Sequence, residues 1–321
     1  MTSARLRIGV IGTGFGARVV APVFDATEGC EVIEVVTARD AASVGALCRR
    51  GDVDLISVHS PPFLHADHVR VALAAGHAVL CDKPFGLDAR ESAELCDDAE
   101  VAGVVNLVNF EFRHDPVRRR LHELVTTGVI GDVEHVSWTH VSAGSRVPLR
   151  PYGWLFSRES GGGWIGAWGS HAVDAIRWIF GEVEAARAKR RITVAQRPDR
   201  DGIDQRVDVE DGFSAELQLA SGASVLFDTT FAATASLAPR LVVAGTDGVL
   251  DCVGDARLTL RRPDGSHDTF ERPAADGDPH LVPMRRWAEI VRDAVTTGER
   301  IPPTFADGWA CDVVLDQLRA G

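Results

Sequence analysis

Lysine is nearly absent from this chain of 321 residues, which contains only Lys83 and Lys189 among its 34 basic residues. Acidic residues number 46, so the formal net charge is −12. A surface of this sign repels phosphate backbones and anionic headgroups, and we therefore expect neither a nucleic-acid partner nor a membrane partner. Because arginine supplies nearly all positive charge here, each remaining lysine is a candidate for a specific role.

Long apolar runs and paired cysteines are also missing. No apolar stretch approaches the roughly 18 residues that span a bilayer, and the first residues lead directly into a strand pattern without a secretory leader. None of the six cysteines forms a C-x-x-C pair, which argues against a zinc cage or a disulfide framework and favours a reducing compartment. We expect a cytoplasmic globular protein. The cysteines are Cys30, Cys48, Cys81, Cys96, Cys252 and Cys311.

The first third of the chain alternates short apolar segments with helical ones. Expected strands lie at 6–11, 31–37, 53–59, 78–81 and 104–110, with helices at about 17–26, 41–50, 64–75 and 88–101. This alternation predicts an α/β Rossmann domain over 1–115, with a parallel, doubly wound sheet. Strands joined by turns dominate the remainder, with helices after Asp115 and at 170–180, 281–296 and 307–319. We expect an α+β domain over 116–321 with a large, open-faced, mostly antiparallel sheet.

A glycine-rich turn, Gly12-x-Gly14-x-x-Ala17, lies between the first expected strand and helix. Gly12 permits a tight turn, Gly14 lets the backbone approach a pyrophosphate, and the small Ala17 allows close helix packing. The helix N-terminus offers N–H groups and a favourable dipole to phosphate. This context predicts dinucleotide binding, although a tight turn alone also requires glycine.

The end of the second expected strand indicates which cofactor binds. An NAD site usually has an acidic residue here to hold the ribose hydroxyls, but this chain has Ala38. The next residue, Arg39, can pair with a 2′-phosphate and stack on adenine. NADP is therefore favoured over NAD, and a solvated loop arginine is the alternative interpretation.

Several motifs follow one another along nearly the whole chain. They are the strand and glycine turn at 8–16, a "T-P-x-x-x-H"-like stretch at 60–65, Asp82-Lys83-Pro84 in place of "E-K-P", an "N-x-R-F-x-P"-like segment at 109–116, and "G-G-G…G-x-H-x-x-D" at 161–174. In this order and spacing the chain resembles the glucose–fructose oxidoreductase, inositol dehydrogenase and rhizopine-catabolism (Gfo/Idh/MocA) family.

The resemblance implies NAD(P)-dependent oxidation or reduction of sugars and related polyols in a cleft between the domains. It also implies homodimers or homotetramers formed through the C-terminal sheet. Lys83 would lie at the nicotinamide and the substrate hydroxyl, and His171 would act in proton transfer. The residues expected at the cofactor are Gly12, Thr13, Gly14, Phe15, Gly16, Thr37, Arg39, Ser60, Pro61, His65, Asp82, Lys83 and Asn109.

Two departures from the family pattern affect these expectations. Ala167 stands where the family often has an aspartate, so one acidic partner of His171 is missing. Only one expected helix separates Thr37 from Val53, where family members usually have a further strand and helix. The lost piece belongs to the sheet edge near the adenosine end, so we expect an effect on cofactor affinity more than on the fold.

Hydride transfer from a carbinol needs an oriented nicotinamide, a proton acceptor and positive charge beside the developing alkoxide. Lys83 follows a strand end, where open α/β sheets bind ligands, and can polarise the substrate oxygen. His171 lies at the expected start of a helix, which favours its neutral form, and Asp174 could orient its ring. Tyr152 would line the cleft. The alternatives are a surface lysine, a core or capping histidine and a core tyrosine.

Other functions and sites remain open at this point. A nucleotide-sensing protein without catalysis would suit Ala167 and the short Rossmann half, although the retained Lys83 and His171 oppose it. A lyase or glycosidase-like enzyme that uses the cofactor transiently has the same motifs. The tryptophans Trp154, Trp164 and Trp168 either line the cleft or belong to the core. No carboxylate or cysteine converges in sequence on His59, His65 and His68, and we expect no metal site there.

Overall fold

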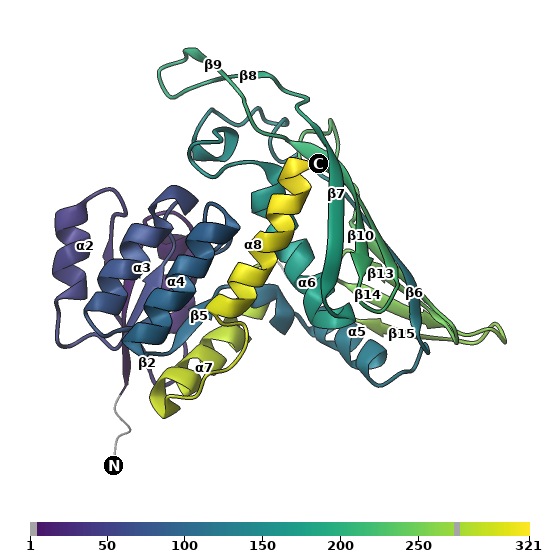
Figure 1. Cartoon of the computed structure of the whole chain (residues 1–321), viewed down its shortest axis with the longest axis horizontal. Helices are drawn as coiled ribbons and strands as arrows, with labels where there is room; N and C mark the ends of the chain where they lie inside the picture. The colour runs from purple at the N-terminus through teal and green to yellow at the C-terminus, as the bar shows by residue number, and fades with distance from the viewer. Residues whose placement is uncertain (1–4, 273–276) are drawn as a thin grey trace. The chain divides into compact units, whose positions relative to one another are not determined.

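The computed structural model describes residues 5–272 and 277–321, which form two compact units (Figure 1). The first unit comprises Met1–His114 and Asp276–Val313, and the second comprises Asp115–Ala275 and Val314–Gly321. The segment 276–313, which the sequence analysis assigned to the C-terminal domain, is thus grouped with the first unit. No helix among the described residues is long and apolar enough to cross a membrane.

A five-stranded parallel sheet forms the centre of the first unit. Its spatial order is β2 (Cys30–Val36), β1 (Leu6–Ile11), β3 (Leu55–Val58), β4 (Ala78–Cys81) and β5 (Asn106–Val108). Every residue of β3 and β4 is buried, as expected for parallel strands covered on both faces. Strand β2 forms one edge of the sheet, consistent with the expected loss of a strand and helix after Thr37.

Four helices connect these strands, and one from the end of the chain completes the core. The connecting helices are α1 (Ala21–Asp25), α2 (Ala41–Cys48), α3 (His65–Ala74) and α4 (Ala89–Ala102). Helix α4 is capped by Asp88, which accepts a hydrogen bond from the backbone N–H of Glu91. Helix α7 (Leu281–Thr297) buries Met284, Trp287 and Val291 in the same core as Phe24.

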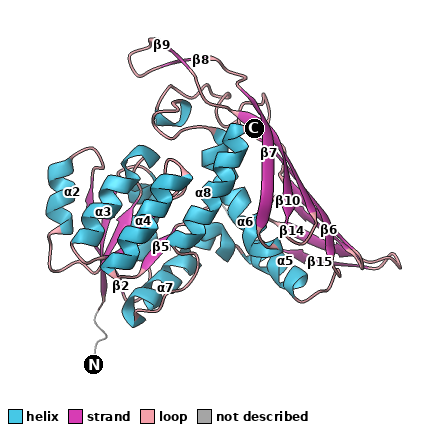
Figure 2. Ribbon diagram, in the orientation of Figure 1, coloured by secondary structure: helices cyan, strands magenta, loops and turns pink. Residues whose placement is uncertain are grey.

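The second unit contains an eight-stranded sheet (Figure 2). Strands β6 and β11 pair in parallel, and the other described neighbours in this sheet pair antiparallel. Its spatial order is β15 (His267–Glu271), β14 (Arg257–Arg261), β13 (Val249–Val253), β12 (Arg240–Gly245), β6 (Val133–Val141), β11 (Ser224–Thr230), β10 (Gly212–Leu219) and β7 (Val183–Arg191). Helices α5 (Pro116–Thr126) and α6 (Ser170–Phe180) lie on one side of it. The predicted fold class is therefore confirmed.

Burial alternates along the central strands of this sheet. Trp138, Phe213 and Phe227 are buried on the side of the helices, while Leu226 on the opposite face is 45% exposed. A two-stranded hairpin, β8 (Gln196–Pro198) and β9 (Asp204–Arg206), extends from the same unit. Helix α8 (Phe305–Ala320) begins in the first unit, and its last residues belong to the second.

Candidate active site

The three glycines of the turn differ in how much space surrounds them: a side chain would fit at one position and would meet close neighbours at the other two. Gly12 has φ +132°, and a Cβ there would lie 2.4 Å from the carbonyl oxygen of His59. A Cβ on Gly16 would lie 3.0 Å from Cβ of His59, whereas one on Gly14 would meet no described atom within 4 Å. The sequence pattern assigned the close helix packing to Ala17, but in the structure Gly16 is the residue that packs closely. The helical backbone begins at Gly16 with a π-turn (Gly16–Val20). Gly14 leaves room for the pyrophosphate of a dinucleotide.

A buried network beneath this turn links the carboxyl ends of three strands. The Oγ of Ser57 lies 2.7 Å from Nε2 of His59, and Nδ1 of His59 lies 3.2 Å from Oδ2 of Asp82. The other carboxylate oxygen accepts hydrogen bonds from the backbone N–H of Lys83 at 2.9 Å and from the side chain of Asn109 at 3.4 Å. These contacts fix the peptide from which the Lys83 side chain extends.

The charge of Asp82 is set by its partners. Burial by itself would raise the pKa of Asp82, but the hydrogen bond and charge of His59, together with the nearby Lys83, hold that pKa well below its ordinary value. Asp82 is therefore a carboxylate at any pH near neutrality. Asn109 is fully buried, and its Oδ1 has no hydrogen-bond partner among the described residues. An unsatisfied buried acceptor at a strand end is a natural contact for a bound ligand.

The loops that flank Lys83 are held by two further side chains. The ring of His65, which is 1% exposed, bridges the carbonyl oxygens of Ser60 at 2.8 Å and Pro84 at 3.0 Å. Asp312 on α8 accepts a hydrogen bond from the backbone N–H of Gly86 at 2.9 Å. His65, which the sequence placed at the cofactor, therefore joins the loop after β3 to the loop that follows Lys83. Its neighbour His68 is also buried and bonded to the Ser60 hydroxyl.

The remaining predicted cofactor residues lie on loops at the same strand ends. Thr37 and Arg39 are exposed just beyond β2, and Ala38 between them is buried. The carbonyl of Val36 accepts a hydrogen bond from Gly12, so this loop adjoins the glycine turn. Thr13 is exposed in the turn, Phe15 is half-buried, and Ser60 and Pro61 follow β3. The structure thus brings the predicted cofactor set together at one edge of the first unit.

A carboxylate–imidazole pair at this edge was missed by the sequence analysis. Glu111 follows β5, and its Oε1 lies 2.5 Å from Nδ1 of His280, which precedes α7. The ring of His280 contacts Phe15 edge-on, with centroids 4.9 Å apart. Only the position of Glu111 directly after a strand could have indicated it, because His280 belongs to none of the recognised motifs.

In the second unit, His171 and Asp174 lie on α6 and are 8% and 2% exposed. His171 is the second residue of α6, as predicted, and a π-turn (Ile165–Gly169) runs directly into this helix. The N-terminal N–H of Ile165 is satisfied by Oε1 of Glu210 at 2.9 Å. The positive end of this continuous helical segment therefore faces Glu210.

Tyr152 and the predicted tryptophans belong to packed clusters of the second unit. Tyr152 packs against Leu155, Phe156, Val207 and Val209, and its backbone N–H donates to Pro198. The preceding loop is fastened by the buried guanidinium of Arg197, which donates to two backbone carbonyls and lies 4.0 Å from the ring of Phe156. Trp164 and Trp168 are 9% exposed and contact other aromatic rings, which favours the core interpretation for both.

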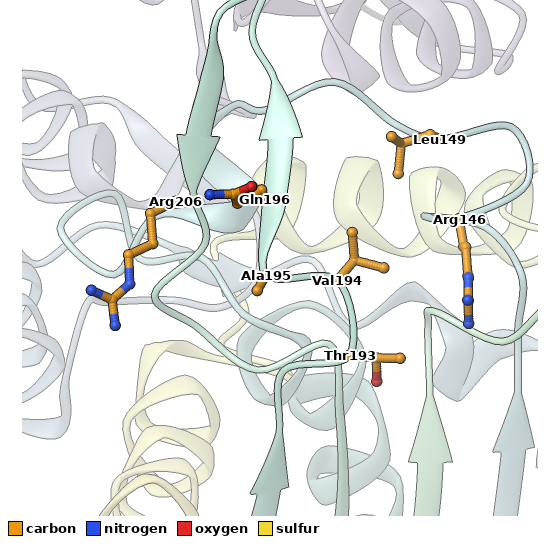
Figure 3. Close-up of a pocket in the computed structure, with 7 residues that line it drawn as sticks. All are labelled: Arg146, Leu149, Thr193, Val194, Ala195, Gln196 and Arg206. Carbon is orange, nitrogen blue, oxygen red and sulfur yellow. The ribbon is translucent and has the colours of Figure 1, made fainter.

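A separate pocket of about 820 Å³ lies beside the β8–β9 hairpin (Figure 3). None of the predicted site residues lines it. The figure shows Arg146 and Arg206 on opposite sides, with Val194 between them. Its lining residues are Arg146, Leu149, Thr193, Val194, Ala195, Gln196 and Arg206.

Two family models match the chain. Residues 6–110 match the oxidoreductase family with an NAD-binding Rossmann fold, and residues 118–251 match the GFO/IDH/MocA C-terminal domain. Similar proteins include an uncharacterized oxidoreductase of Synechocystis sp., 32% identical over 97% of this chain and 85% of that protein. The inositol 2-dehydrogenase of Rhizobium meliloti is 24% identical over 97% and 95% of the two chains, and the D-xylose 1-dehydrogenase (NADP⁺) 2 of Haloferax volcanii is 28% identical over 92% and 90%.

Solved structures agree with this match. Levoglucosan dehydrogenase in its apo form superposes with a TM-score of 0.89 at 20% identity, over 99% of this chain and 96% of that one. Its complex with NADH gives 0.88 at 21% identity, over 98% and 96%. The glycine turn, the strand-end network around Lys83 and these matches lead to one conclusion. The chain belongs to the GFO/IDH/MocA oxidoreductase family and is an NAD(P)-dependent dehydrogenase.

Proposed function

We propose that this protein transfers a hydride between NADP and a hydroxyl or keto carbon of a sugar or polyol. The observation that carries the proposal is the buried Ser57–His59–Asp82 network, which fixes the Lys83 peptide at the strand ends beside the open position at Gly14. The relatives named above for inositol, xylose and levoglucosan support this substrate class.

The residues of the first unit suit a dinucleotide cofactor. Gly14 leaves space for the pyrophosphate, and Asn109 offers a buried acceptor. Arg39 is exposed on the loop after β2, next to Ala38, which stands where an NAD site usually has an acidic residue. An arginine here would pair with a 2′-phosphate, so we favour NADP over NAD. When bound, the cofactor supplies the nicotinamide that accepts or donates the hydride.

Each proposed catalytic residue has a distinct task. The ammonium of Lys83 polarises the substrate oxygen and stabilises the alkoxide that develops there. A histidine exchanges the hydroxyl proton, and the family resemblance assigns this role to His171, with Asp174 to orient it. Tyr152 contributes to the substrate-facing surface of the second unit.

Turnover with NAD and NADP over a panel of sugars and polyols tests this proposal. Net reduction of NADP with at least one substrate is the expected result. Cofactor binding without any turnover would instead support a sensor, which the loss of an acid at Ala167 favours. Product formation without net change of the cofactor would support a lyase or glycosidase-like reaction.

We also propose that copies of the chain associate as dimers or tetramers through the exposed face of the eight-stranded sheet. This face has a hollow over β6, β7, β10 and β11, with Leu226 exposed beside it. A monomeric mass in analytical ultracentrifugation would contradict the assembly.

We propose a cytoplasmic location because the cysteines are unpaired thiols. All six are free, and burial raises the pKa of the Cys30 and Cys48 thiols to about 11, so these two resist oxidation. Fractionation of the native host's cells would test the location.

A further inference from the structure

Glu111 and His280 form a pair whose two members differ sharply in exposure. The carboxylate side chain is 1% exposed, whereas 27% of the imidazole side chain is exposed. With Nδ1 of His280 donating to Oε1 of Glu111, the ring has a fixed orientation and tautomer, and proton exchange falls to Nε2. A buried carboxylate behind a more exposed imidazole is the arrangement that orients catalytic histidines in many unrelated enzymes.

The pair lies where an open parallel sheet binds its ligands. Glu111 begins the helical turn η3 (Glu111–His114) just after β5, and Lys83 follows the neighbouring strand β4. The His280 ring lies between Phe15 of the glycine turn and Phe112, with centroid distances of 4.9 Å to each. It therefore adjoins the predicted cofactor site on one side.

Three charged groups of the first unit act on the His280 ring. Burial lowers the pKa of His280, but the hydrogen bond and the charge of Glu111 outweigh this, and the net shift is upward. Lys83, at the end of β4, opposes the charged form of the ring, while Asp278, in the segment before α7, favours it. The pair and the proposed electrophilic lysine follow neighbouring strands, so a charge on one acts on the other.

We propose that His280 is a catalytic proton-transfer residue of the dehydrogenase reaction and that Glu111 is its positioning residue. The inference rests on the proposed function. We assign the titrating step to His280 because the buried carboxylate of Glu111 holds its ring. His171, to which the family resemblance assigns proton transfer, is the alternative, and its own variants test it.

In the oxidative direction the substrate loses one proton and one hydride. Nε2 of His280 takes the proton from the substrate hydroxyl, and the C–H bond of the same carbon breaks, with its electron pair leaving as hydride to the oxidised nicotinamide. The products are a carbonyl compound, the reduced cofactor and an imidazolium held by Glu111. In reduction, the imidazolium returns the proton to the carbonyl oxygen as the carbon receives the hydride.

The test is kcat against pH in both directions for the parent, Glu111→Gln, His280→Gln and a control, His267→Gln, at an exposed position on β15. Oxidation needs the neutral ring and should rise with pH, while reduction needs the imidazolium and should fall. Glu111→Gln keeps an acceptor but removes the charge, so both midpoints should move to lower pH, by about one unit or more. His280→Gln should lower kcat at least about 100-fold and remove the midpoint. The control should match the parent.

Calorimetric binding of NADPH reports on folding, and His280→Asn replaces His280→Gln if the latter does not fold. An unmoved midpoint in Glu111→Gln, or parental turnover in the His280 variant, would overturn the pair's role while the dehydrogenase proposal stands. A folded parent that turns over no substrate with either cofactor would overturn both proposals.

Discussion

Gly14→Val should abolish cofactor binding while leaving the fold intact. No described atom lies within 4 Å of a Cβ at this position, and no left-handed φ is required there. The unfolding free energy should therefore change by no more than about 0.5 kcal/mol, as at an ordinary surface site. The branched side chain would fill the space that the pyrophosphate needs, and affinity should fall at least about 100-fold, or about 2.8 kcal/mol.

Gly12→Ala, two residues away, should instead destabilise the fold. Its φ of +132° is strained for alanine, and the new Cβ would lie 2.4 Å from a backbone oxygen that cannot move without displacing β3. Strain of this kind costs about 1–3 kcal/mol before the clash is added. We expect a clear loss of stability, with weaker binding as its consequence.

Isothermal calorimetry with NADPH and urea unfolding followed by circular dichroism separate the two effects. Gly51→Ala is a matched control, since a Cβ there also meets no described atom within 4 Å. Parental affinity in Gly14→Val would remove the pyrophosphate from this turn. A Gly14→Val protein as unstable as Gly12→Ala would refute the distinction drawn from the two environments.

Variants of Arg39, of Lys83 and of the Asp174–His171 pair test the other proposed roles. Arg39→Ala should weaken NADP by on the order of 1–3 kcal/mol and NAD much less, since one charge-assisted contact is lost; equal effects in calorimetry would exclude a 2′-phosphate contact. Lys83→Ala should lower turnover at least about 100-fold with little change in cofactor affinity, and surviving turnover would make this lysine structural. Asp174→Asn should lower kcat, and its combination with His171→Ala should match His171→Ala alone; additive losses would limit Asp174 to supporting α6.

Local patterns were sufficient to predict the class of both sheets. The apolar segment at 78–81 and the largely apolar one at 55–58 indicate strands covered on both faces. The alternation at 212–219 indicates a strand with one open face. The grouping of α7 with the first unit was not predictable in this way. Its amphipathic pattern shows that one face is buried but not which core receives it.

The sequence predicted the site residues that belong to recognisable motifs, and it did not predict the others. The glycine turn and Lys83 stand in recognisable local contexts. The Glu111–His280 pair joins residues 169 positions apart, and no local signal connects them. The true start of the helical segment before His171 also depends on a distant residue, because Glu210 holds the N–H of Ile165. Long-range hydrogen bonds of this kind are decided by tertiary structure.

The return of α7 to the first unit has a consequence for biosynthesis. Phe24 and its neighbours share a core with Trp287, so the nascent N-terminal sheet leaves the ribosome with part of its apolar surface uncovered. Translation of the intervening segment 115–275 takes roughly 10–30 s at about 5–20 residues per second. During this interval the unfinished domain exposes part of its apolar core, and the second unit can fold before the first is complete.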